Sequence, residues 1–135
     1  MAAPKIPDAI RSYLINTTGI TDTVSLYALQ PTPITQYAVV EYPGTQSTRV
    51  HGSSTPGGDV ALDESLIQIQ SRHATVQTAR NNLHTVYDAL DGLSDVTINS
   101  VVYTYMQAIS RPRLLDYEEN GSAIFIFELR VQARR

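Results

Sequence analysis

The sequence has no cysteine and no tryptophan, and only two phenylalanines, among its 135 residues. Without cysteine the chain can form no disulfide, no thiolate metal site and no thiol nucleophile. Long hydrophobic runs are also missing, and no stretch approaches the roughly 18 apolar residues of a membrane-spanning helix. The N-terminal residues MAAPKIPDAI lack the apolar segment of a signal peptide. We therefore expect a soluble protein, made in a cytoplasm and without a membrane partner.

Charge is scarce as well. Charged residues make up 17% of the chain, the net charge is −3 and the pI is about 5.5. DNA-binding domains usually carry a basic surface that neutralises phosphates, so this balance argues against a tight grip on duplex DNA. It does not argue against brief passage of DNA past the surface. A polar but weakly charged surface also suits permanent protein contacts, because charge is depleted at the centre of interfaces.

The residues that catalysis or metal binding would need are sparse. His51, His73 and His84 are the only imidazoles, and none forms an HxH, HxxxH or Glu-x-x-His pair with metal-ligand spacing. The sequence contains no Gly-x-Ser-x-Gly, Gly-x-Gly-x-x-Gly or phosphate-binding loop pattern. These observations predict a protein that is not an enzyme and that has no cofactor and no metal.

One carboxylate cluster, Asp116, Glu118 and Glu119, precedes Asn120-Gly121. Paired carboxylates can act as acid and base when a cleft separates their pKa values. In an exposed loop they more often form a solvated turn, or they contact a partner. We keep the three residues as candidates for a partner interface.

Hydrophobic periodicity and turn residues indicate the secondary structure. Apolar residues at helical spacing predict helices, and alternating or continuous apolar runs predict strands. The predicted helices cover about residues 7–18 and 75–90, and the predicted strands cover about 24–29, 37–42, 66–72, 96–98, 101–109 and 123–133. Asn99-Ser100 reads as a tight hairpin turn. The pattern predicts a single α+β domain over residues 1–135, with a mainly antiparallel sheet of five or six strands and two helices on one face.

The last strand has two distinct faces. One face is wholly apolar. The other is half apolar, which is more than a solvated surface requires. Its residues Ile124, Ile126, Glu128 and Arg130 are therefore candidates for a subunit or partner interface.

A long segment at about 43–64 contains almost nothing that could form a core. Loops of this length are uncommon within compact domains and are usually functional or disordered. The segment is either a mobile surface loop or an arm that orders against a neighbouring subunit. Arg49 lies within it and Tyr42 precedes it. Both are interface candidates, because arginine and tyrosine are enriched at interfaces.

Several segments resemble the bacteriophage tail terminator family, whose members are also called tail completion or minor capsid proteins. The similar segments are SLYAL (25–29), YAVVEYPG (37–44), LIQIQSR (66–72), residues 79–92, the stretch containing Pro112, Asp116 and Asn120-Gly121, and the closing aromatic strand. The resemblance covers about residues 24–133 and lies in the order and spacing of these segments. The Gly/Ser/Pro-rich insertion after Pro43-Gly44 departs from the family pattern.

The resemblance implies a structural protein of the virion tail or neck. Six copies would form a ring on the last ring of the tail tube, ending its polymerisation. The implied partners are other copies of the chain, the major tail tube protein and the head-completion (stopper) protein, with DNA only passing through the lumen. Two alternatives stay open: a head–tail connector or stopper protein, and a small-molecule-binding α+β regulatory domain.

Overall fold

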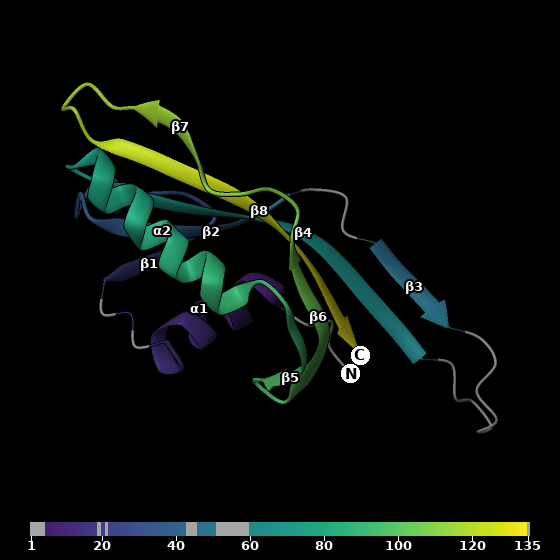
Figure 1. Ribbon diagram of the computed structural model, residues 1–135. Coiled ribbons are helices and arrows are strands. Elements are labelled where there is room, and N and C mark those ends of the chain that lie inside the picture. The colour runs from purple at the N-terminus through teal and green to yellow at the C-terminus, as the bar shows by residue number, and fades with distance from the viewer. Residues whose placement is uncertain (1–4, 19, 21, 43–45, 51–59, 135) are drawn as a thin grey trace.

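The computed structural model describes residues 5–18, 20, 22–42, 46–50 and 60–134. Within these residues the chain forms two helices, α1 (Ile6–Asn16) and α2 (Val76–Leu90). The strands are β1 (Thr23–Leu26), β2 (Gln36–Glu41), β3 (Gln46–Val50), β4 (Val60–His73), β5 (Leu93–Ile98), β6 (Val101–Ala108), β7 (Arg113–Tyr117) and β8 (Ala123–Arg134). Figure 1 shows both helices on the same side of one curled sheet. The predicted α+β fold is confirmed.

All the described strands belong to one sheet. Six of them follow the order β1-β2-β4-β8-β6-β5, while β3 pairs with β4 and β7 pairs with β8. The pairing of β1 with β2 is parallel, and every other described pairing is antiparallel. The sheet is therefore mixed, because residues 27–35 cross over between β1 and β2 and do not make a hairpin.

Two long strands organise this sheet. β4 and β8 pair along 12 positions, from Leu62↔Arg134 to His73↔Ala123. The outer edge of β4 pairs first with β3 and then with β2. The outer edge of β8 pairs with β7 at its start and with β6 at its end. The short strands β3 and β7 thus lie at opposite ends of the sheet, as Figure 1 shows.

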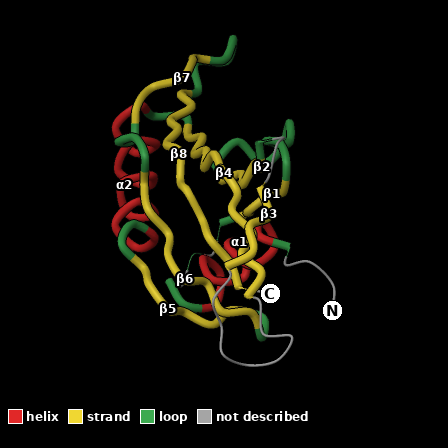
Figure 2. Tube along the Cα trace, turned by 90° about the vertical axis from the view of Figure 1, so that its right-hand side faces the viewer, coloured by secondary structure: helices red, strands yellow, loops and turns green. Residues whose placement is uncertain are grey.

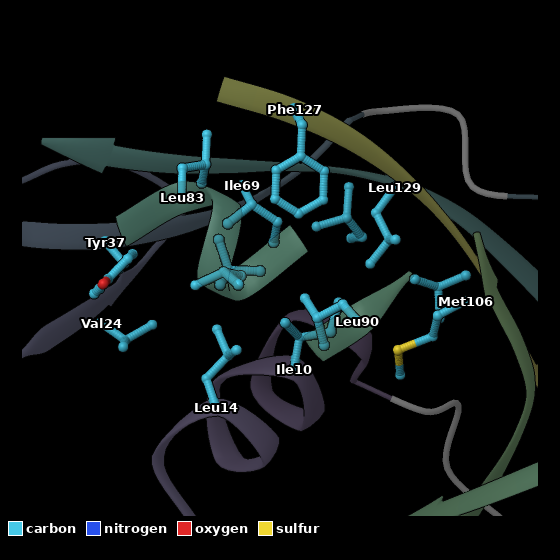
Figure 3. Packing of buried hydrophobic residues seen from close by; sticks show 14 of the residues in the cluster. Ile10, Leu14, Val24, Tyr37, Ile69, Leu83, Leu90, Met106, Phe127 and Leu129 are labelled. Atoms are coloured by element: carbon cyan, nitrogen blue, oxygen red, sulfur yellow. The ribbon is translucent and has the colours of Figure 1, made fainter. Parts of the chain in front are cut away.

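The core lies between the sheet and the helices (Figure 3). Leu83 and Leu90 of α2 pack on the apolar face of β8, where Phe127 and Leu129 are fully buried. The ring of Tyr87 meets Phe127 edge-on, with centroids 5.4 Å apart. α1 adds its stripe of apolar residues and packs against β1, β2 and β5. In Figure 2 both helices again lie on one side of the curled strands. Fully burying a side chain of this size stabilises the fold by about 1.5–3 kcal/mol.

The hairpin turn between β5 and β6 has the predicted geometry. Asn99 and Ser100 have φ of 52° and 67°, and the flanking residues Ile98 and Val101 pair directly. Two consecutive positive φ angles define a turn whose twist matches that of the adjoining strands. Serine adopts this conformation here, although glycine is the more usual residue at the second position.

Two segments expected to be loops contain strands. Residues 113–117 form β7, and 46–50 pair with 60–64 as the start of a β3–β4 ladder. Residues 43–45 and 51–59 of the predicted 43–64 loop lie outside the described residues. All five residues of β7 are exposed, so the strand has no alternation of buried and exposed positions for sequence reasoning to detect. Its pairing with β8 makes it a strand.

Candidate assembly interface

The face of β8 that points away from the helices carries four of the predicted interface residues. They differ widely in exposure. Ile126 is only 2% exposed and packs within the chain, whereas Ile124 is half-buried. Arg130 has a side chain that is 48% exposed. The structure thus leaves Ile124 and Arg130 with more surface for a partner than Ile126.

Glu128 fixes the place where the outer edge of β8 passes from β6 to β7. Its carboxylate forms an ion pair with Arg113 of β7, whose Nη1 donates to Oε2 over 2.7 Å. Ser110, in the connection between these strands, donates its hydroxyl to the same carboxylate and accepts the backbone N–H of Glu128 at 3.0 Å. The hydrogen bond from Arg113 holds the pKa of Glu128 below its ordinary value, and the bond from Ser110 acts in the same direction. Glu128 therefore positions β7.

Glu128→Gln is expected to lower the free energy of unfolding by about 1–2 kcal/mol at neutral pH, because a charge-assisted pair at a partly exposed site becomes a neutral one. A depressed pKa stabilises the fold above the unfolded-state pKa of about 4.5, and this stabilisation is lost as the pH falls through the folded-state pKa. The difference between wild type and variant should therefore shrink in acid. Urea denaturation at about pH 7 and about pH 3 measures it. An equal difference at both pH values would contradict this role for the ion pair.

A second ion pair crosses from β8 to β4. Arg130 Nε lies 3.4 Å from Glu64 Oε1, and the hydroxyl of Tyr105 donates to Glu64 Oε2 over 2.8 Å. On the same helix-free face, the hydroxyl of Tyr42 accepts a hydrogen bond from Gln68 Nε2 at 2.7 Å. Tyr42 is half-buried. These side chains form two polar clusters on the helix-free face, Tyr105–Glu64–Arg130 and Tyr42–Gln68.

Arg72 forms a third ion pair, which sequence reasoning missed. Its side chain is 5% exposed, and Nη1 lies 3.0 Å from Glu118 Oε1. Its remaining donors reach backbone carbonyls in the β1–β2 crossover: Nε donates to Ile34 and Nη2 to Pro33, both over 2.8 Å, and Nη2 also donates to Gln30. The alternation along residues 66–72 indicated only that Arg72 points away from the apolar face. Its burial depends on a crossover that is distant in sequence.

The acidic cluster lies at the β7–β8 turn. Asp116 and Glu119 are exposed, and Glu118 is held by Arg72. Residues 116–120 line an open hollow in the surface. The structure therefore brings the three predicted carboxylates together, next to β7.

Arg49 lies at the other end of the sheet, in β3. Its backbone pairs with Ala61 of β4, one register position beyond the Thr48↔Leu62 pair. Leu62 in turn pairs with Arg134 of β8. Arg49 is therefore separated from the Asp116–Glu119 cluster by the length of the β4–β8 ladder.

The part of the chain that the structure describes contains no group of three or more His, Asp or Glu side chains placed to hold a metal ion. Neither of the described helices is long and apolar enough to cross a membrane.

Comparisons with known proteins place this fold. A family model described as bacteriophage tail terminator protein matches residues 3–135. Among solved structures, a chain from the virion of a native gene transfer agent particle is similar, with a TM-score of 0.50 and 19% sequence identity. The match covers 97% of this chain and 89% of that chain. At this identity the likeness shows a shared fold. No curated protein matches the sequence.

Proposed function

The chain belongs to the bacteriophage tail terminator protein family, and we propose that it assembles into a ring, of six copies as the family resemblance suggests, which closes the head-proximal end of the tail tube. As a member of this family it is a structural protein of the phage tail. The proposed ring would stop polymerisation of the tube and offer a surface to the head-completion protein. The observation that carries the proposal is the family match, which spans nearly the whole chain and includes every described helix and strand.

The mechanism we propose is steric, with no bond made or broken. The charged side chains on the helix-free face of the sheet serve structural roles: the Arg72–Glu118, Arg113–Glu128 and Arg130–Glu64 pairs each tie two segments of the chain together. The partners in this proposal are other copies of the chain, the major tail tube protein and the head-completion protein. The chain would be part of the virion tail or neck after assembly in the host cytoplasm.

DNA would pass through the lumen of such a ring without being held. The chain carries a net charge of −3. Three arginines, Arg72, Arg113 and Arg130, are each paired with a carboxylate of the same chain. Strong binding of duplex DNA needs several cations that are free to replace counterions on phosphates. A surface of this composition favours sliding over clamping.

The proposal is tested by removing the gene from the phage that encodes this chain. Negative-stain images should show tails of excessive or irregular length that are not joined to heads, and the wild-type chain supplied in trans should restore normal particles. Tails of normal length beside filled heads that leak DNA would overturn the terminator role and indicate a stopper. The restored particles also show by gel electrophoresis whether the chain is a virion component.

A further inference from the structure

The described sheet has four edge strands: β1 and β5 at the two ends of the six-strand path, and β3 and β7 beside β4 and β8. α1 packs against β1 and, less extensively, against β5. Arg11 of α1 also donates its Nε–H to the carbonyl of Val24 in β1, over 2.9 Å. A carbonyl of β1 that already accepts this hydrogen bond is not free to pair with a further strand.

β3 and β7 have no comparable packing against a helix among the described elements. Each is five residues long, and each pairs with a single described strand. β7 is also unusually apolar for an edge strand. Leu115 and Tyr117 are 52% and 53% exposed, and Leu114 is exposed as well. An exposed apolar edge is a template for strand pairing, and proteins usually blunt it with charges or cover it.

The positions of these two edges point to a second copy of the same chain. β3 lies on the outer edge of β4, and β7 lies on the outer edge of β8 at the opposite end of the sheet. Two different free edges that face away from each other cannot pair within one chain. Paired across copies, they would make a head-to-tail contact, and repetition of such a contact gives a ring when the rotation between copies closes.

Charge does not separate the two ends of the sheet. Asp116 and Glu119 are exposed beside β7, but Arg113 lies within β7. At the opposite end Arg134 ends β8, whereas Asp63 and Glu64 lie in the part of β4 that pairs with β3. The exposed apolar edge of β7 and the positions of the two edges carry the inference.

We propose that β7 of one copy pairs edge to edge with β3 of the next copy, so that one sheet continues from subunit to subunit around the ring. This inference rests on the proposed ring function and names the contact that builds it. The backbone groups of the two strands supply the hydrogen bonds. Leu114, Leu115 and Tyr117 supply apolar surface.

Cysteine cross-linking tests this contact cleanly, because the natural chain has no cysteine. Thr48→Cys in β3 is combined in turn with Leu114→Cys, Leu115→Cys or Tyr117→Cys in β7, and each full-length variant is incorporated into virions by complementation. Neighbouring strands bring opposite Cα atoms to about 4.5–5.5 Å, which a disulfide can span. After mild oxidation, at least one pair should give a ladder of linked chains on a non-reducing gel, extending from the dimer to the closed ring.

Matched controls separate this contact from chance collisions. Each single-cysteine variant should give no species beyond the dimer. The pair of Thr48→Cys with Val76→Cys, a residue on α2 that is about as exposed as Leu114 of β7, should not form a ladder. Thermal unfolding of the purified variants verifies that each one folds.

The outcomes distinguish failure of the β7–β3 contact from failure of the proposed terminator function. Virions that contain the folded variants but show no ladder for any of the three pairs would overturn the β7–β3 contact and leave the terminator function standing. Absence of the wild-type chain from the virion tail would overturn the function itself.

Discussion

Arg72→Met is expected to lower the free energy of unfolding by about 2–4 kcal/mol, because it removes a buried guanidinium that bonds a partly exposed carboxylate and three backbone carbonyls. Arg72 is nearly fully buried and serves Glu118 and three backbone carbonyls at once. Methionine has a similar length but no donor. The substitution therefore removes the hydrogen bonds that Arg72 donates to the carboxylate of Glu118 and to the carbonyls of the β1–β2 crossover. Urea denaturation followed by circular dichroism measures the loss.

Arg113→Met is the matched control. Arg113 also pairs with a glutamate on the helix-free face, but its side chain is far more exposed than that of Arg72. As for Glu128→Gln, loss of this partly exposed pair should cost about 1–2 kcal/mol, so this variant should lose less stability than Arg72→Met. Equal losses in the two variants would show that burial of Arg72 does not set its contribution. A further consequence concerns the proposed interface: without Arg72 the Glu118 turn next to β7 loses its anchor, and ring formation should weaken as well.

Alkaline pH is expected to destabilise the fold by about 2–3 kcal/mol for each of two buried tyrosines. Burial raises the pKa of Tyr37 to about 12 and that of Tyr103 to about 12, and nearby Asp22 and Asp8 act in the same direction. Below pH 10 both hydroxyls are neutral in the folded and the unfolded chain, so their contribution is fully present. Between pH 10 and about 12 the unfolded chain ionises first, and the contribution is lost.

The measurement compares wild type with the Tyr37→Phe/Tyr103→Phe double variant in urea at about pH 9 and about pH 11.5. The wild type should lose more stability between these two values than the variant, because phenylalanine does not ionise. Tyr105, whose pKa is also raised, is present in both proteins and cancels in the comparison. Parallel losses in the two proteins would contradict the assignment to Tyr37 and Tyr103.

The local pattern of the sequence was enough to predict much of the fold. The apolar stripes of α1 and α2 recur at helical spacing, and β8 alternates over its whole length, so these elements follow from local periodicity. The turn at Asn99-Ser100 followed from its position between two short apolar runs. The order of the elements then made an α+β domain the natural outcome. The partial resemblance over residues 24–133 pointed to the family that the match over residues 3–135 establishes.

The candidate site was only partly predictable. Ile124 and Ile126 occupy equivalent positions in the alternation of β8, yet Ile126 is buried and Ile124 retains surface. The two residues have different neighbours in the sheet. Ile126 pairs with Gln70 and Arg113, while Ile124 pairs with Arg72 and Asp116. No local pattern contains this information.

The sequence by itself determined the two helices, the long alternating strand and the absence of cysteine chemistry, because these depend on residue type and short-range spacing. The tertiary structure alone decided three further features. It turned residues 113–117 into an exposed edge strand, it buried Arg72 beneath a crossover about 40 residues away in sequence, and it placed β3 and β7 at opposite ends of the sheet. Each of these depends on which distant segments pair, and pairing is fixed by the packing of the whole chain.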